Sequence, residues 1–178
     1  MDLTEKAVTQ EYIYEGRIIK LHVDKAELPN KKIVTREVVE HNGGVCVVAI
    51  DNENNIYMVE QFRYPYMQTT LEIPAGKRDK DEHPLECGKR ELKEETGAVS
   101  EHFEYLGELY PSPGYCGEII YMYKATGLSF GECDPDDDEF LNLKKIPLDT
   151  VVQMILKGEI KDAKTQAAVL KVKLLANN

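Results

Sequence analysis

The sequence predicts an α/β fold in which a mixed central sheet lies between helices and an antiparallel β extension precedes it. Apolar and polar residues alternate through much of residues 11–41, which is typical of strands. Residues 45–50 form a continuous apolar run that suits a strand buried on both faces. Helical patterns occur at residues 84–96 and again near the C-terminus. These observations together favour a sheet that is covered by helices.

Polar turn residues separate the predicted strands. Residues 29–32 (Pro-Asn-Lys-Lys) predict a turn between two strands of the N-terminal extension. The polar stretch 51–55 predicts another turn, so the apolar run before it and residues 56–62 after it should form a hairpin of the central sheet. Further strands are expected at residues 105–110, 118–125 and 140–143.

The helix predicted at residues 84–96 has recognisable ends. Pro84 suits the first helical turn, where its missing N–H would have no partner, and Gly97 suits the left-handed residue that ends a helix. Gly88 inside this helix costs up to ~1 kcal/mol relative to alanine, so another constraint must favour glycine there. Two further helices are expected near the C-terminus, at residues 148–157 and at residues 162–175.

Length and charge narrow the class of protein. The 178 residues suit one main domain at residues 41–178 after a β extension at residues 1–40. The net charge of −10 argues against a nucleic-acid binder, because phosphate backbones are held chiefly by lysine and arginine. No stretch approaches the roughly 18 apolar residues of a membrane span. The four cysteines form no CxxC pair, so we expect reduced thiols and a cytoplasmic protein.

An acidic run on the predicted helix is the first candidate for chemistry. Glu91, Glu94 and Glu95 lie at i, i+3 and i+4, so their carboxylates fall within about 100° of arc. They repel one another unless a divalent cation lies between them, and Mg²⁺ prefers such oxygens. Taken alone, the run more often belongs to a solvated face, with neighbouring basic residues balancing it and Arg90 pairing with Glu94.

The residues around the acidic run extend it into a longer pattern. Gly76 is followed after five residues by Glu82, and after seven more by Arg90-Glu91-Leu92-Lys93-Glu94-Glu95-Thr96-Gly97. This pattern, which ends at Ala98, resembles the Nudix box, the metal-binding loop–helix–loop of the Nudix hydrolases. The resemblance implies a Nudix fold. Ala98 and the pair Cys87-Gly88 are smaller or less usual residues than the box carries, which puts packing in question more than chemistry.

The resemblance also implies roles for single residues. Glu91, Glu94 and Glu95 would bind Mg²⁺, with Mn²⁺ as an alternative, and Glu94 would take part in catalysis. The main-chain carbonyl of Ala75 would add another oxygen ligand. Glu82 would support the loop, and Arg90 would orient the glutamates as part of the catalytic set.

Three stretches outside the box resemble the ADP-ribose pyrophosphatase branch: residues 71–77 (LEIPAGK), Pro113 and residues 158–165. The function implied is Mg²⁺-dependent hydrolysis of the pyrophosphate of ADP-ribose to AMP and ribose 5-phosphate. One alternative is a pyrophosphatase for another nucleoside-diphosphate sugar. The other is a non-catalytic nucleotide-binding module on the Nudix fold, against which the intact set of glutamates argues.

A general base is expected in the acidic run at residues 134–139, where this branch carries a catalytic glutamate. Glu139 is the only glutamate of the run, although Asp136 or Asp138 could take the role, and a solvated acidic loop explains the run equally well.

The remaining candidates concern the substrate, a small nucleoside-diphosphate molecule. Arg36 and Arg63 are expected to hold phosphate or ribose oxygens, because arginine suits bidentate phosphate contacts. Arg36 is the weaker candidate of the two, since an ordinary arginine on a surface strand explains it better. Tyr12, or else Tyr14, could stack on adenine from the N-terminal extension, although a place in a core or an interface explains a tyrosine there at least as well. Pro113 would line the substrate site. By resemblance, the protein should be a homodimer that exchanges its N-terminal strands.

Overall fold

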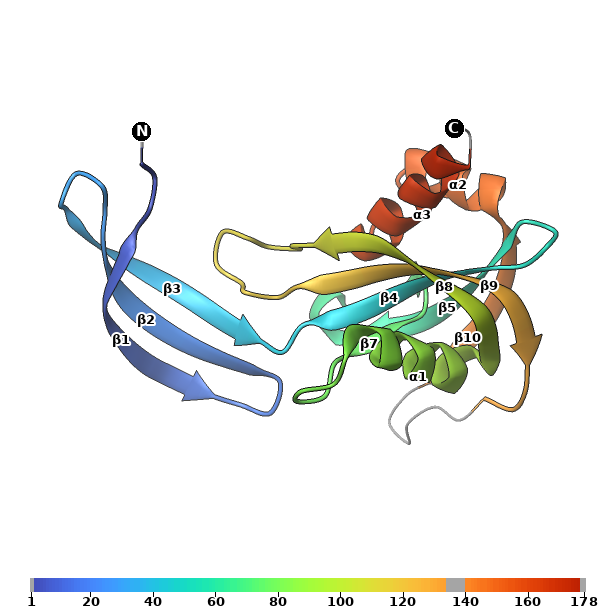
Figure 1. The fold of residues 1–178 in the computed structure, drawn as a ribbon, viewed down its shortest axis with the longest axis horizontal. Helices are drawn as coiled ribbons and strands as arrows, with labels where there is room; N and C mark the ends of the chain where they lie inside the picture. The colour runs from blue at the N-terminus through green and yellow to red at the C-terminus, as the bar shows by residue number, and fades with distance from the viewer. Residues whose placement is uncertain (1, 134–139, 177–178) are drawn as a thin grey trace. The chain divides into compact units, whose positions relative to one another are not determined.

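The computed structural model describes residues 2–133 and 140–176, which form two compact units (Figure 1). The first unit comprises residues 1–43 and 110–119, and the second comprises residues 44–109 and 120–178. Each unit has a sheet of its own, so the two are described separately. In the described ranges, no helix is long and apolar enough to cross a membrane.

The first unit contains an antiparallel sheet of three strands in the order β1-β2-β3. The strands are β1 (Lys6–Glu15), β2 (Ile19–Glu27) and β3 (Ile33–His41). Every residue of β1 is exposed, and the buried side chains of β2 are His22 and Ala26. This antiparallel sheet agrees with the predicted N-terminal extension, but it encloses almost no core.

The second unit is built on a mixed sheet of seven strands. Its main path runs β10 (Asn142–Pro147), β5 (Asn55–Arg63), β4 (Gly44–Ile50), β9 (Ile120–Phe130) and β8 (Ala98–Leu109). Strand β4 is parallel to β9 and antiparallel to β5, with Ala49 opposite Tyr57, which confirms the predicted mixed sheet and its hairpin. Two short strands join the path: β6 (Gln68–Glu72) pairs with β5, and β7 (Ala75–Lys77) pairs with β4.

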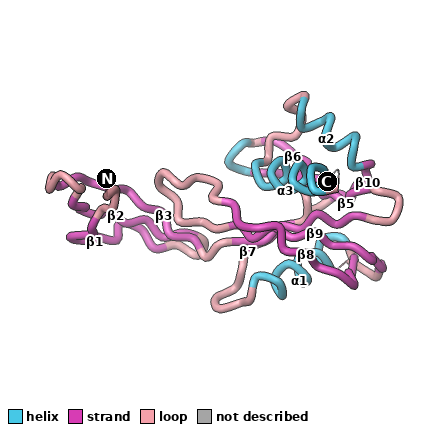
Figure 2. The backbone as a smooth tube through the Cα atoms, turned by 45° about the horizontal axis from the view of Figure 1, so that its top comes forward, coloured by secondary structure: helices cyan, strands magenta, loops and turns pink. Residues whose placement is uncertain are grey.

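Strand β4 is buried along its whole length and separates two cores. Its side chains alternate between the faces of the sheet, as the geometry of a strand requires. Val45, Val47 and Ala49 pack with α1 (Pro84–Thr96) on one face. Cys46, Val48 and Ile50 pack with α2 (Leu148–Leu156) and α3 (Ala163–Leu175) on the other. Figure 2 shows α1 on one side of the sheet and α2 and α3 on the opposite side. The prediction of a strand buried on both faces, between helices, is confirmed.

The ends and interior of α1 follow from its sequence. His83 caps the start, where its side chain accepts a hydrogen bond from the N–H of Leu85, and Gly97 ends the helix with φ +69°. A Cβ added at Gly88 would lie 3.0 Å from a methyl carbon of Val45 on β4. The close approach of helix and strand is therefore the constraint that favours glycine at this position. Cys87 and Ala98 are fully buried in the same core, so the small residues fit the packing.

Several predictions of secondary structure need correction. The strands expected at residues 105–110 and 118–125 are longer and placed differently, as β8 (Ala98–Leu109) and β9 (Ile120–Phe130). The strand expected at residues 140–143 is β10, at Asn142–Pro147, and Phe140 before it is 86% exposed. Strands β6 and β7 were not predicted, because they are short and their sequences carry little alternation. Helix α2 ends at Leu156, one residue earlier than expected.

Candidate functional site

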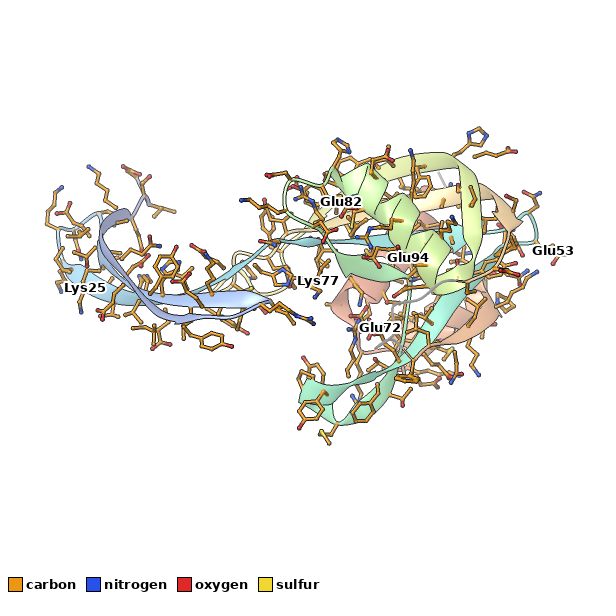
Figure 3. All side chains as sticks on the ribbon, turned by 90° about the horizontal axis from the view of Figure 1, so that it is seen from below. Lys25, Glu53, Glu72, Lys77, Glu82 and Glu94 are labelled. Carbon is orange, nitrogen blue, oxygen red and sulfur yellow. The ribbon has the colours of Figure 1, made fainter. Side chains whose placement is uncertain are left out.

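Helix α1 presents its three glutamates in two environments. Glu91 and Glu95, one turn apart, are 7% and 5% exposed, whereas the side chain of Glu94 is 31% exposed. Burying a carboxylate is costly unless other groups compensate for its lost hydration. The helix therefore offers two sheltered carboxylates and one that solvent reaches. Figure 3 shows Glu94 on the helix and Glu82 in the loop that precedes it.

Gly76 lies directly against the carboxylate of Glu91. A Cβ added at this position would overlap the carboxyl carbon and both oxygens of Glu91. The spacing of the sequence pattern thus has a steric reason, since a larger residue at position 76 would displace the Glu91 carboxylate. No other glycine of the described chain faces the box glutamates in this way.

The backbone next to Gly76 is fixed from several sides. The N–H of Ala75 donates to Oε2 of Glu95 at 3.0 Å, and Ala75 pairs with Cys46 of β4. Two residues earlier, the N–H of Ile73 donates to Oγ1 of Thr165 in α3 at 3.0 Å. The carbonyl of Pro74 accepts from the N–H of Val47 at 2.9 Å. The chain that carries the predicted carbonyl ligand is therefore held between the sheet, α1 and α3.

Arg90 links the loop before α1 to the glutamates. Its Nε and Nη2 lie 3.0 and 3.1 Å from the carboxylate oxygens of Glu82, and its Nη2 donates to the carbonyl of Lys77. Its Nη1 lies 2.9 Å from an oxygen of Glu91 and 2.9 Å from an oxygen of Glu94. The hydrogen bonds from Arg90 lower the pKa of Glu82 to about 2, and those to Glu82 raise the pKa of Arg90. Arg90 is thus a brace that both orients and neutralises the carboxylates.

The donor set suits a divalent cation by its chemistry. It combines sheltered carboxylates with an adjacent main-chain carbonyl, which are the hard oxygen ligands that Mg²⁺ prefers. In residues 2–133 and 140–176, no three acidic, histidine or cysteine side chains are already arranged as metal ligands. Arg90 and the N–H of Ala75 hold carboxylate oxygens of the set. A bound cation would compete with these contacts for the same oxygens.

A second charged cluster lies at the end of β5. Arg63 is the member of this cluster that was predicted from the sequence as a site residue. The predicted residue Arg63 makes a bidentate contact with Glu72, in which Nε and Nη2 lie 2.8 and 2.7 Å from the carboxylate oxygens. Glu72 is 2% exposed and also contacts Nζ of Lys164 from α3. Burial would raise the pKa of Glu72, but Arg63 and Lys164 overcome this effect and lower it to about 2.

The charged cluster and the Nudix box interact electrostatically. Hydrogen bonding to Glu72 raises the pKa of Arg63, and the charge of Glu95 contributes to the same shift. One sequence signal could have revealed Glu72, since it is a charged residue inside the otherwise apolar stretch that leads to Ala75. Lys164 lies in residues 158–165, which resemble the ADP-ribose branch, but that resemblance assigned it no role.

The other substrate candidates lie in the first unit. Arg36 on β3 pairs with Glu5, with its Nη2 2.8 Å from a carboxylate oxygen. The hydroxyl of Tyr12 on β1 donates to Glu40 at 2.8 Å. Pro113 lies exposed in the segment 110–119. Their participation in the site stays a prediction, and the proposed base Glu139 lies outside the described residues.

The four cysteines are free thiols in different surroundings. Cys46 and Cys87 are buried, and burial raises the pKa of the Cys46 thiol to about 12 and also raises that of Cys87. Cys116 is partly exposed and Cys133 is exposed.

Comparison with known families matches the two parts of the chain separately. Residues 40–169 match the NUDIX domain, and residues 5–39 match the nucleoside diphosphate sugar hydrolase N-terminal domain. The chain is 47% identical over 167 residues to a methanol dehydrogenase activator of Bacillus methanolicus, covering 93% of this chain and 90% of that protein. It is 40% identical over 169 residues to an ADP-ribose pyrophosphatase of Bacillus subtilis, covering 94% and 91%.

Among solved structures, the crystal structure of an ADP compounds hydrolase has the same fold. Its TM-score is 0.87 at 20% sequence identity, and the match covers 99% of this chain and 97% of that one. The match of the NUDIX domain over most of the chain, together with relatives of this identity and coverage, identifies the box on α1. The chain therefore belongs to the Nudix family and is a Nudix hydrolase.

Proposed function

We propose that this protein hydrolyses the pyrophosphate of ADP-ribose, with Mg²⁺ as its metal, and releases AMP and ribose 5-phosphate. The observation that carries the proposal is the box itself, in which Gly76 and Ala75 lie against the carboxylates of Glu91 and Glu95. The relative from Bacillus subtilis that is named an ADP-ribose pyrophosphatase supports the choice of substrate.

We expect one group of residues to bind the cation and Arg90 to orient the carboxylates that bind it. Glu91, Glu94 and Glu95 would hold the cation together with the carbonyl of Ala75. A bound divalent cation would neutralise the diphosphate and make water a better nucleophile at neutral pH. Arg90 keeps the carboxylates oriented through its contacts to Glu91 and Glu94. Mn²⁺ could replace Mg²⁺, because both take hard oxygen ligands.

Arg63 would contact a phosphate of the substrate with the part of its guanidinium that Glu72 does not engage. Arginine suits this role because its planar donors match phosphate oxygens. We expect Arg36 and Tyr12 from the N-terminal unit, and Pro113, to complete the substrate site.

The proton of the attacking water would pass to a side chain in residues 134–139, with Glu139 as the first candidate. The change Glu139→Gln removes a base while it keeps the size of the side chain. We expect kcat to fall by about 100-fold or more, as loss of a general base usually costs. An unchanged kcat would remove Glu139 and leave Asp136 and Asp138 to be tested in the same way.

The test of the proposed function is a steady-state assay with Mg²⁺ on a panel of diphosphates. The panel contains ADP-ribose, ADP-glucose, GDP-mannose, NAD⁺ and nucleoside triphosphates. We expect the highest kcat/KM for ADP-ribose. Turnover of ADP-ribose no better than that of the other sugars would overturn the choice of substrate, and turnover of none would favour a nucleotide-binding module.

The metal assignment is tested with Glu95→Gln, which preserves the side-chain shape and an acceptor for the N–H of Ala75. We expect kcat to fall by more than about 100-fold, because loss of an outer partner of a metal site already costs about 10- to 100-fold and Glu95 is the proposed ligand itself. Circular dichroism should show that the fold persists. Near-normal activity would mean that Glu95 is not a metal ligand.

A second candidate function is activation of a dehydrogenase, because the relative with 47% identity is named a methanol dehydrogenase activator. Many dehydrogenases use dinucleotide cofactors, whose two halves are joined by a pyrophosphate linkage of the kind found in ADP-ribose, so NAD⁺ belongs in the panel. A preference for NAD⁺ over ADP-ribose would favour this candidate.

We propose further that the protein is a homodimer whose N-terminal strands are exchanged between subunits. Support comes from the exposed apolar residues Val8, Ile13 and Tyr14 of β1, which are between 55% and 57% exposed. A three-stranded sheet with almost no core needs another surface to cover it. A cytoplasmic location stays a prediction, supported by the free state of the four cysteines.

A further inference from the structure

We propose that Lys164 is a positioning residue, which holds the guanidinium of Arg63 for a substrate phosphate by fixing the carboxylate of Glu72 between them. The inference rests on the proposed function in one respect, because it takes Arg63 to be a phosphate contact. Lys164 itself would not touch the substrate.

The carboxylate of Glu72 receives donors on both oxygens. Oε1 accepts from Nε of Arg63 at 2.8 Å and from Oγ1 of Thr70 at 2.6 Å. Oε2 accepts from Nη2 of Arg63 at 2.7 Å and from Nζ of Lys164. A carboxylate has about four lone-pair sites, so these four bonds leave Glu72 one orientation. Glu72 is thus a fixed template for the edge of Arg63 that it binds.

The geometry leaves one edge of Arg63 for a ligand. Glu72 engages Nε and Nη2, whereas Nη1 donates no hydrogen bond to any residue in the described ranges. The Arg63 side chain is 38% exposed, in contrast to 2% for Glu72 and 9% for Lys164. The guanidinium is therefore anchored on its buried side and open on the other, which is the arrangement that a bidentate phosphate contact requires.

Lys164 is itself anchored before it reaches Glu72. Its Nζ lies 3.0 Å from Oδ1 of Asp162, and the other oxygen of Asp162 caps α3 by accepting from the N–H of Thr165 at 2.9 Å. The cluster contains two positive side chains, Arg63 and Lys164, and two negative ones, Glu72 and Asp162. Replacing Lys164 by a neutral residue would leave one excess negative charge where an anionic substrate must approach.

Fold stability does not by itself require charged side chains at the positions of this cluster. Buried ion pairs are often no more stabilising than apolar residues of the same size, because the loss of hydration offsets their attraction. A lysine with 8% exposure at this point therefore indicates a positional requirement. The requirement we infer is the orientation of Arg63, the most exposed member of the cluster.

The experiment compares Lys164→Met with Lys164→Arg as the conservative variant and Lys161→Met as the matched control. Lys161 is exposed and lies in the same segment, and it makes no ion pair with any described residue. The first measurement uses the protein without metal: the rate at which Nε–H of Arg63 exchanges with water, followed by ¹⁵N NMR and assigned by its loss in Arg63→Lys. We expect slow exchange in the wild type, Lys164→Arg and Lys161→Met, and faster exchange in Lys164→Met.

The second measurement is steady-state kinetics on whichever diphosphate of the panel the wild type turns over best. We expect Lys164→Met to raise KM about tenfold or more, since small misplacements of a positioning group have effects of this size. The change in kcat should be smaller, Lys164→Arg should restore KM in large part, and calorimetry should give the same affinity for Mn²⁺ as the wild type. A merely structural role for Lys164 would lower the thermal midpoint without this pattern.

Two results for folded Lys164→Met would overturn the inference. The first is slow exchange of the Arg63 Nε–H together with an unchanged KM. The second is a lowered affinity for Mn²⁺ that accounts for the loss of activity. If Lys164→Met does not fold, Glu72→Gln takes its place in both measurements with the same expected directions. The proposed function is judged separately, on the panel with the wild type. If the wild type turns over no diphosphate, binding of inorganic pyrophosphate replaces KM.

Discussion

At the scale of single residues, the site depends on the absence of a side chain at Gly76 as much as on the charged side chains around it. Glu91 occupies the space that any side chain at position 76 would need. Because Glu91 is 7% exposed, its carboxylate has little room to move away without leaving its place beside Gly76 and Arg90. The glycine therefore fixes the position of a predicted ligand.

We predict that Gly76→Ala lowers kcat/KM with Mg²⁺ by about 100-fold, because displacing a reacting group by even 1 Å can cost this much. The matched control is Gly117→Ala, where an added Cβ would have the carbonyl oxygen of Val39 as its nearest neighbour, at an ordinary 3.7 Å. Steady-state kinetics and the thermal midpoint of both variants provide the check. Wild-type kinetics in Gly76→Ala would show that the Glu91 carboxylate can shift without consequence.

Contacts between residues close in the sequence could be predicted, whereas contacts between residues that only the fold brings together could not. Arg90 and Glu94 lie four residues apart on one helix, so their contact could be predicted from helix geometry, and the structure contains it. Glu72 and Lys164 are separated by 92 residues, and no periodicity connects them. Only the packing of α3 beneath the sheet brings this lysine to that carboxylate.

At the scale of elements, the first turn of α3 supports the backbone that carries the predicted carbonyl ligand. Thr165 is fully buried, and its Oγ1 donates to Asp162 at 2.6 Å while it accepts from the N–H of Ile73 at 3.0 Å. Ile73 and Ala75 are separated only by Pro74. The Thr165 hydroxyl, on a helix near the C-terminus, thus helps to hold the segment between β6 and β7 in place.

We predict that Thr165→Val weakens Mn²⁺ binding by about tenfold, within the range that loss of an outer partner costs a metal site. Valine keeps the volume of threonine but leaves the N–H of Ile73 without an acceptor, so Ala75 loses one restraint. Thr165→Ser is the matched control, because it keeps the hydroxyl. Titration calorimetry with Mn²⁺ distinguishes them, and equal affinities for both variants would contradict the prediction.

The elements themselves were predictable where the pattern was long. The helix at 84–96 and the buried strand were recognised because they have clear ends or a continuous apolar run. Strands β6 and β7 were not, since their pairing depends on neighbours in the sheet and little on their own composition. Strand β10 was misplaced because Phe140 resembles a strand residue but is exposed.

At the scale of the whole molecule, the two carboxylates with lowered pKa values link stability to pH. Glu72 and Glu82 each have a folded-state pKa of about 2, below the ordinary 4.5. The folded protein therefore binds these protons less readily than the unfolded chain does. The resulting stabilisation is fully present above pH 4.5 and is lost as the pH falls from there toward about 2.

We predict that the free energy of unfolding declines through this pH window, with a contribution from Glu72 on the order of 3 kcal/mol. Urea unfolding at a series of pH values measures the decline. Glu72→Gln should be less stable near neutral pH and should show a shallower decline, because the titrating group is gone. A slope identical to that of the wild type would mean that Glu72 does not contribute to the linkage.

A further prediction concerns assembly. We expect Ile13→Glu to raise the dimer dissociation constant by about tenfold or more, as removal of a central apolar contact does at many interfaces. Leu156→Glu is the matched control, since Leu156 is 68% exposed on α2 of the other unit. Analytical ultracentrifugation at several concentrations provides the measurement. A wild type that stays monomeric at all concentrations would refute the exchanged dimer.

The four thiols differ in accessibility, so the protein should react selectively with thiol reagents. Alkylating dyes react with an accessible thiolate, so the buried Cys46 and Cys87 should stay unmodified while the exposed Cys133 reacts first. With the partly exposed Cys116 changed to serine, a single fluorophore could be attached immediately before residues 134–139, where the general base is predicted. The chain with Cys116 changed to serine would thus carry one reactive thiol for site-specific labelling.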